Sequence, residues 1–211
     1  MDEVVFYNKD MRLKTLFIRF YKSFNYDYLE RYAENPRQPQ PWEWVDGEQE
    51  KWYPYVQIPI DPKVTTIVGA NESGKTHLLD AIKKGISGQG ISYEDFCRYS
   101  QFFAVTQGKL RLPDFGYEWA DLSDQEKQKV KQSSAIEQEF ERFLVFRSNG
   151  DNLTIYIPGE NQQYDSYVVN SAHVKPFTKF LPNILPIKAS IALPDSVPIE
   201  EILSGLLGSW S

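Results

Sequence analysis

Short apolar and aromatic stretches in the first third of the chain predict three strands. Residues Arg12–Phe20 (RLKTLFIRF) are rich in β-branched and aromatic side chains, which is typical of a strand. In Trp52–Ile60 the alternation of valine and isoleucine predicts a second strand, and its two prolines place that strand at a sheet edge. Val64–Val68 (VTTIV) is a short apolar run that indicates a buried strand. A loop or flap rich in proline and tryptophan is expected at about residues 35–51.

Helices are predicted after these strands. In Lys75–Lys84 the apolar residues recur at helical spacing, and Gly85 is a plausible helix stop. Ser92–Asp95 has the pattern of a capping box, with aspartate where glutamate is commoner. The polar stretch Ser123–Phe140 and the segment Ser196–Leu207, which has a proline and two glutamates in its first turn, also predict helices.

A β-hairpin region is predicted at about residues 143–169. Phe143–Ser148 and Leu153–Ile157 are strand-like and flank Asn149-Gly150, a pair that readily adopts the positive φ angles of a tight turn. Tyr164–Val169 is expected to add a third strand. The region therefore indicates an antiparallel β subdomain.

Composition and charge exclude several classes of protein. The 211 residues are 41% hydrophobic and 25% charged, as in an ordinary globular protein, and no apolar run is long enough to span a bilayer. The acidic N-terminus lacks the apolar segment of a secretory signal, and the single Cys97 has no internal disulfide partner, so a reducing cytoplasm is expected. The net charge of −6, and the interleaving of lysines 127, 129 and 131 with other residues, give no sign of a phosphate-binding track for DNA.

One motif points to specific chemistry. Gly69-Ala-Asn-Glu-Ser-Gly-Lys-Thr76 matches G-x-x-x-x-G-K-[ST], the P-loop, between a predicted strand and a predicted helix. Its glycines let successive backbone N–H groups point inward, and the following helix contributes its positive end. Lys75 can reach the β- and γ-phosphates, and the Thr76 hydroxyl can ligate Mg²⁺. The motif predicts that the chain binds a nucleotide, and the alternative is an ordinary glycine turn.

The residues around the motif resemble a known family. Two strands precede the P-loop strand, whereas small-molecule kinases and GTPases place the P-loop after their first strand. The stretches Leu16-Phe-Ile-Arg-Phe-Tyr-Lys-Ser-Phe24 and Thr66–Ile82 are similar to the N-terminus of SMC/RecF/OLD-type ATPases, within residues 13–24 and 64–82. This resemblance implies an α/β fold: a P-loop NTPase, the N-lobe of an ABC-type ATPase head, with parallel core strands and an antiparallel β subdomain.

The resemblance also implies which residues bind Mg-ATP. The P-loop residues would line the triphosphate, namely Gly69, Asn71, Glu72, Ser73, Gly74, Lys75, Thr76 and His77. Lys22 stands where the family usually has an arginine near the phosphates; the alternative is a solvated lysine at a strand end. A glutamine of the family helps hold Mg²⁺ together with Thr76, and Gln101 is preferred over Gln107 for this role, although both fit a plain surface position.

Three parts that the family needs for hydrolysis have no good match. Ile191–Asp195 is the nearest segment to a Walker B strand, but Pro194 interrupts it and no glutamate follows. Leu203–Leu206 only faintly resembles a signature motif, and His173 lies too early to be a switch histidine. Residues 1–211 are therefore expected to be a single N-terminal ATPase lobe whose second lobe is absent.

The resulting prediction is an ATP-binding lobe of a protein acting in DNA repair or anti-phage defence. The expected partners are the missing C-terminal lobe and a second copy joined through ATP-bound heads, with DNA in the full assembly and no membrane. Hydrolysis is expected only of the complete dimer. Two alternatives remain open: a free-standing kinase-like phosphotransferase, using one of Arg98, Arg111, Arg142 and Arg147, or a non-catalytic assembly module whose tryptophans (42, 44, 52, 119 and 210) form an interface.

Overall fold

The computed structural model describes residues 3–7, 10–25, 38–45, 52–70, 73–106, 108–150, 152–160 and 163–187. The chain divides into two compact units, one made of residues 1–9 and 182–211 and the other of residues 10–181. In the first unit, β1 (Glu3–Tyr7) pairs antiparallel with β8 (Asn183–Ile187), a pairing that the sequence did not predict. The predicted helix Ser196–Leu207 lies outside the described residues.

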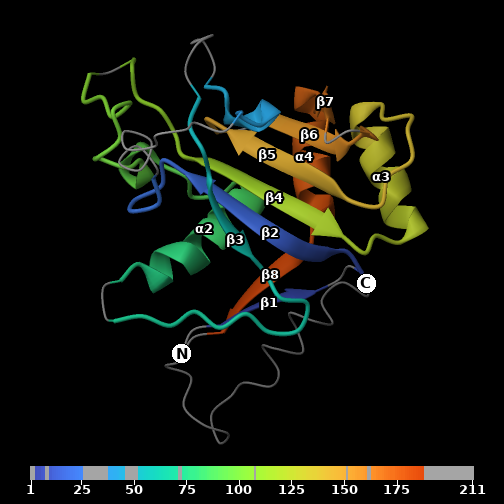
Figure 1. Ribbon diagram of the computed structural model, residues 1–211, viewed down its shortest axis with the longest axis horizontal. Helices are drawn as coiled ribbons and strands as arrows, with labels where there is room; N and C mark the ends of the chain where they lie inside the picture. The colour runs from blue at the N-terminus through green and yellow to red at the C-terminus, as the bar shows by residue number, and fades with distance from the viewer. Residues whose placement is uncertain are drawn as a thin grey trace, which may run out of the picture. The chain divides into compact units, whose positions relative to one another are not determined.

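The second unit is built on one six-stranded sheet with the order β3-β2-β4-β5-β6-β7 (Figure 1). Its strands are β2 (Arg12–Arg19), β3 (Val56–Pro59), β4 (Asp114–Ala120), β5 (Phe143–Ser148), β6 (Asn152–Pro158) and β7 (Tyr164–Val168). Every neighbouring pair in it is antiparallel. The fold is thus α/β with an antiparallel sheet, and the parallel core strands expected from the resemblance do not occur among the described pairings.

Central strand β4 shows how the sheet separates its two faces. Phe115, Tyr117 and Trp119 point to one face and are almost completely buried. Residues 114, 116 and 118, which alternate with them, belong to the other face because side chains alternate along a strand. Both sets are buried, so β4 is covered on both faces.

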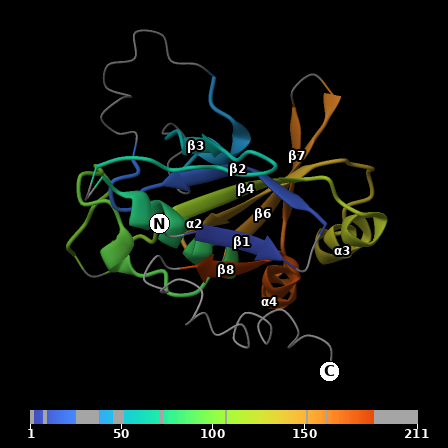
Figure 2. The same ribbon diagram turned by 90° about the horizontal axis from the view of Figure 1, so that it is seen from below.

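Helices α2 (Lys75–Ser87) and α4 (Ser171–Phe180) cover one of these faces (Figure 2). Gly85 of α2 faces β4 so closely that a Cβ on it would lie 2.8 Å from the Cβ of Phe115. The prediction that Gly85 ends the helix is therefore wrong, since α2 continues to Ser87 and is capped by Gly88 at φ 68°. Glycine at position 85 instead allows the helix to approach the sheet closely.

An aromatic cluster covers the opposite face. The short 3₁₀ helix η1 (Pro41–Glu43) lies within the predicted flap and places Trp42 over the sheet, where its ring stacks on Phe146 at 5.0 Å. Phe17 and Tyr55 also contact this cluster edge-on. Trp42 and Trp119 are thus core residues, Trp44 is exposed and Trp210 lies outside the described residues.

The predicted hairpin region is confirmed. Strands β5 and β6 pair through Ser148 and Asn152, and the turn residues Asn149 and Gly150 have φ values of 45° and 100°. Strand β7 adds to β6 as the third strand. The predicted helix at Ser123–Phe140 is shorter in the structure, where α3 spans Asp124–Ser134.

The segment before the P-loop differs from its prediction. Val64–Val68 forms no strand, and Val64 and Val68 are 74% and 84% exposed. The prediction of a buried strand here is therefore wrong for the chain by itself. Edge strand β3, in contrast, lies within the predicted Trp52–Ile60 and at the sheet edge, as its prolines indicated. None of the helices in the described part of the chain has the length and apolar character needed to cross a membrane.

Candidate nucleotide-binding site

The P-loop motif lies at the start of α2. Gly74 is the N-cap residue and has φ 91°, a conformation that favours glycine, and the helix begins at Lys75. The first N–H groups of a helix have no partner within it, and the helix dipole makes this end electropositive. The prediction that a helix follows the P-loop is confirmed. The N-terminal end of α2 can bind an anion.

The ammonium group of Lys75 is turned back onto its own loop. Its Nζ donates to the carbonyl oxygen of Gly69 at 2.8 Å and also to that of Ala70. The Oγ of Ser73 lies 3.5 Å from the same nitrogen. These neutral acceptors compensate the charge only in part, so a phosphate group that displaced them would gain a full charge–charge interaction with Lys75.

A second segment borders the P-loop. Directly after β2, the chain makes a tight turn in which Tyr21 and Phe24 exchange backbone hydrogen bonds of 3.3 and 2.7 Å. Within this turn Lys22 has φ 49°, and Ser23 lies so near the helix start that a Cβ on Gly74 would be 3.3 Å from its Oγ. The turn therefore brings Ser23 beside the first turn of α2, and the role that the resemblance implies for Lys22 stays a prediction.

Asp95 anchors Lys22 loosely and Lys84 tightly. Its carboxylate accepts a hydrogen bond of 2.6 Å from Lys84 Nζ, whereas Lys22 Nζ lies 3.7 Å away. Burial raises the pKa of Asp95, but hydrogen bonds from Lys84 and the backbone of Ser92 outweigh it and leave the pKa below its ordinary value. Asp95 also completes the predicted capping box with Ser92. Two lysines thus share one carboxylate, which leaves one net positive charge in this cluster, beside the last turn of α2.

The remaining predicted site residues are only partly placed. Asn71, Glu72 and Gln107 lie outside the described residues. Thr76 is exposed in the first turn of α2, as an incoming Mg²⁺ would require. His77 is half-buried, and its Nδ1 has no hydrogen-bond partner among the described residues. Gln101 is exposed in a turn that follows η2 (Tyr93–Asp95), and its role in holding metal stays a prediction.

Three of the four candidate arginines for phosphate chemistry are engaged elsewhere, and Arg98 is exposed. Arg111 pairs with Asp114, Arg142 with Glu118, and Arg147 is buried against the carbonyl oxygen of Gly85. His173 is exposed in the first turn of α4, and Ile191–Asp195 and Leu203–Leu206 lie outside the described residues. In the described part of the chain, no three His, Cys, Asp or Glu residues cluster to hold a metal ion.

The sequence did not indicate that Ser23 lies beside Gly74 or that Asp95 pairs with Lys22. Ser23 belongs to the stretch that resembles the family, but no motif assigns it a role of its own. Asp95 was predicted only as a capping residue, and the structure confirms that role. It also forms ion pairs with lysines 22 and 84, which lie in other parts of the chain. No spacing in the sequence could have indicated that contact.

Comparison with known proteins gives a remote likeness to a solved structure. No protein-family model matches the chain, and neither does any curated protein. One solved structure, from work on ATP-driven dimerisation and DNA-stimulated activation of SMC ATPases, is 15% identical, with a TM-score of 0.42. The alignment covers 90% of this chain and 95% of that one. Because the identity and the score are both low, we derive no property of this chain from that structure.

Proposed function

We propose that this chain is the ATP-binding N-terminal part of an SMC/RecF/OLD-like ATPase. Mg-ATP would bind at the start of α2, with its phosphates over Gly69–Thr76 and Mg²⁺ on the Thr76 hydroxyl. Lys75 would leave the carbonyl oxygens of Gly69 and Ala70 and move to the phosphates. Lys22 would add a second positive charge from the neighbouring turn.

One observation carries this proposal. A sequence that matches the full P-loop pattern ends at the first turn of a thirteen-residue helix, whose N-cap is a glycine with positive φ. An ordinary glycine turn needs neither a lysine directly after that glycine nor a hydroxyl after the lysine. The position of Ser23 beside Gly74 brings the two stretches that resemble the family into contact, which supports one shared site.

The exposed Val64–Val68 segment supports the expectation of a second lobe. A P-loop normally follows a buried strand, yet these valines are mostly exposed and the segment has no strand partner among the described residues. Burying two valines is worth roughly 1.5–3 kcal/mol each. A partner that supplied strands on either side would recover this free energy, and we propose that the partner is the missing C-terminal lobe.

The complete protein would hydrolyse ATP only as a dimer joined through its ATP-bound heads. It would act on DNA in repair or in anti-phage defence, inside the cytoplasm, where the buried thiol of Cys97 stays reduced. These parts of the proposal rest on the resemblance of residues 13–24 and 64–82.

Binding of Mg-ATP to the purified chain and to Lys75→Ala, measured by isothermal titration calorimetry, tests the site. We expect the substitution to weaken binding by about a hundredfold, since it removes a charge-assisted contact worth about 2–3 kcal/mol. Lys83→Ala is the matched control, because Lys83 is exposed on the same helix. Equal binding by the parent chain and Lys75→Ala would contradict the proposal.

A turnover measurement separates the proposed function from its alternatives. The chain alone is expected to bind ATP without steady release of inorganic phosphate. If the chain alone hydrolysed ATP steadily and Lys75→Ala abolished this activity, the result would support the proposed nucleotide site. It would contradict the proposal that hydrolysis needs a second lobe. Transfer of phosphate to a small acceptor would favour a kinase-like enzyme instead.

A further inference from the structure

The six-stranded sheet has an edge strand on either side, and the two edges differ in how well they are protected. Edge strands present backbone groups that can pair with another chain, and proteins commonly block them with proline, lysine or a β-bulge. Strand β3 forms one edge and ends at Pro59, which has no N–H to donate. Strand β7 forms the other edge, contains neither proline nor lysine and keeps a regular register with β6. The described part of the chain therefore leaves the sheet open at β7.

The backbone of β7 directs its hydrogen-bonding groups alternately to its two sides. Just beyond the strand, Val169 donates its N–H to the carbonyl oxygen of Leu153 on β6 at 2.9 Å. Since every second residue of an antiparallel strand bonds the same neighbour, Asp165 and Tyr167 also bond β6. Ser166, in contrast, directs its N–H and C=O outward, as do residues 164 and 168. No described strand meets these outward groups.

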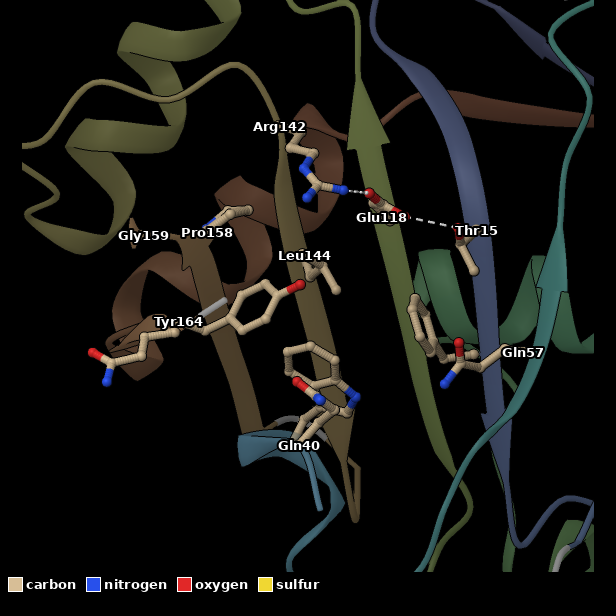
Figure 3. Close-up of a pocket in the computed structure, with 12 residues that line it drawn as sticks. Thr15, Gln40, Gln57, Glu118, Arg142, Leu144, Pro158, Gly159 and Tyr164 are labelled. Atoms are coloured by element: carbon tan, nitrogen blue, oxygen red, sulfur yellow. Dashed lines mark hydrogen bonds and ion pairs between the residues drawn. The ribbon is translucent and has the colours of Figure 1, made fainter. Parts of the chain in front are cut away.

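The side chains of β7 also alternate, and one face carries apolar groups. Tyr164 lies on the aromatic face of the sheet, where its ring meets Trp42 edge-on at 4.8 Å and lies over Leu144 (Figure 3). Val168 belongs to the same face, because it is four residues further along the strand. This valine is 77% exposed. The outer strand thus presents an apolar side chain that no described residue covers.

The sequence of β7 is complementary to itself when two copies run antiparallel. Pairing about Ser166 places Tyr164 opposite Val168 of the second copy, and an aromatic ring opposite a β-branched side chain is a favourable cross-strand pair. The same pairing places Asp165 opposite Tyr167, where the phenol O–H can donate to the carboxylate. These two residues form a pair without backbone hydrogen bonds between them, the kind in which side chains are closest.

Charge selects this register among the neighbouring ones. Asp165 is the one charged residue of β7, and pairing about Ser166 leaves its two copies diagonal to each other, about 7–8 Å apart. Pairing about Asp165 would place the two carboxylates directly opposite, which is unfavourable. Pairing about Tyr167 would leave Tyr164 beyond the end of the partner strand. The register about Ser166 keeps all five residues of the strand paired.

We infer that β7 pairs with β7 of a second copy of this chain about a two-fold axis at Ser166. The two sheets join into one continuous sheet, and Tyr164 of each copy covers Val168 of the other. Because both copies use the same surface, the contact closes at a dimer and does not extend into a polymer. It shares no residue with the proposed nucleotide site and needs no ATP, so it differs from the proposed dimer of ATP-bound heads.

Sedimentation equilibrium of the full chain without nucleotide or Mg²⁺ tests this contact, at chain concentrations from about 10 µM to 1 mM, which suit a small interface. Val168→Lys places a charge at the edge, and Ser166→Pro removes the outward N–H at the axis. Val105→Lys is the matched control, because Val105 is also a highly exposed valine, at 86%, and lies outside β7.

We expect a reversible monomer–dimer equilibrium whose dissociation constant rises by about tenfold or more in Val168→Lys and Ser166→Pro. Val105→Lys should match the parent chain, and so should Lys75→Ala, which separates this inference from the proposed nucleotide site. Urea unfolding of each variant shows that it is folded. A chain that stays monomeric over the whole range, or a dimer that Val168→Lys leaves unchanged, would overturn the inference.

Cross-linking locates the contact independently. Ser166→Cys places a thiol at the axis in both copies, so a short bismaleimide should join them into a covalent dimer. Tyr99→Cys provides the comparison, since Tyr99 is 91% exposed but lies outside β7. The native Cys97 is 1% exposed and should react little. Equal cross-linking of the two variants would contradict a contact at β7.

Discussion

Arg19 and Asp114 form a charge pair with almost no access to solvent. The guanidinium donates from Nε at 3.0 Å and from Nη2 at 2.6 Å to one carboxylate oxygen, and the two side chains are 1% and 0% exposed. The remaining nitrogen of the guanidinium, Nη1, donates to the carbonyl oxygens of Glu43 and Tyr53. The pair therefore joins β2 to β4, and Arg19 also holds Glu43 in the middle of the predicted flap and Tyr53 just after it against the sheet.

Replacing Asp114 by asparagine should destabilise the protein strongly. The change keeps the size of the side chain but leaves Arg19 as a buried charge without its counter-ion, at a cost of about 3–5 kcal/mol. Urea unfolding monitored by circular dichroism measures the loss. Asp121→Asn is the control, since Asp121 also pairs with an arginine but is 62% exposed, and we expect about 0.5 kcal/mol or less there. Equal losses in the two variants would show that burial does not govern the energetics of these pairs.

Stability should fall in mild acid. Burial raises the pKa of Asp114, but the charges of Arg19 and Arg111 outweigh it and hold the pKa below the ordinary value. Burial also raises the pKa of Glu118, but hydrogen bonds from Thr15, Lys14 and Arg142 outweigh it, so this pKa too lies below its ordinary value. The unfolded chain then binds more protons than the folded one, so the free energy of unfolding decreases as the pH falls below about 4–5.

Urea unfolding at a series of pH values checks this dependence. Glu118→Gln removes one of the groups with a lowered pKa, and we expect the slope of stability against pH to become shallower in this range. A variant whose slope matches that of the parent chain would show that Glu118 does not contribute.

Gly85→Ala should destabilise the contact between α2 and the sheet. The added methyl group would meet the Cβ of Phe115 at 2.8 Å and also overlap the Tyr117 hydroxyl. We expect a loss of about 1–3 kcal/mol despite the better helix propensity of alanine. Gly159→Ala is the control, because its nearest atom would be 3.6 Å away. Thermal melts of both variants would contradict this account if they shifted by the same amount.

Lys22→Ala should weaken Mg-ATP binding while leaving the fold intact. Lys22 lies 3.7 Å from Asp95, which Lys84 still neutralises after the substitution, so its removal breaks no close ion pair. Loss of one nearby positive charge is expected to reduce affinity about fivefold, or by about 1 kcal/mol. Titration calorimetry on Lys63→Ala, at an exposed position, provides the comparison. An unchanged affinity in Lys22→Ala would remove this residue from the site.

The outer strands of the sheet were predictable because they carry local signals. Asn149-Gly150 specifies its turn through two positive φ angles, and the prolines of β3 exclude it from the sheet interior. Strand β4 was missed although Phe115, Tyr117 and Trp119 alternate regularly. Its other face consists of Asp114, Gly116 and Glu118, which are disfavoured in strands and are buried here only through long-range partners.

The candidate nucleotide site was predictable to the extent that it is continuous in sequence. The motif indicated where α2 begins and which residues meet at that point. It could not indicate Ser23 beside Gly74 or Asp95 beside Lys22, because these contacts depend on how β2 and η2 fold against α2. Helix α4 escaped prediction because Pro176 lies inside it, although Val174, Phe177 and Phe180 form its apolar face.

The exposure of Val64–Val68 has a consequence for the chain in solution. Backbone amides outside any strand ladder exchange with deuterium far faster than those of a paired sheet, so this segment should label early while β4 and β5 stay protected. A stretch of high β-propensity that pairs with none of the described strands is also a template for pairing between molecules. The isolated chain should therefore aggregate first through the residues that lead into its P-loop.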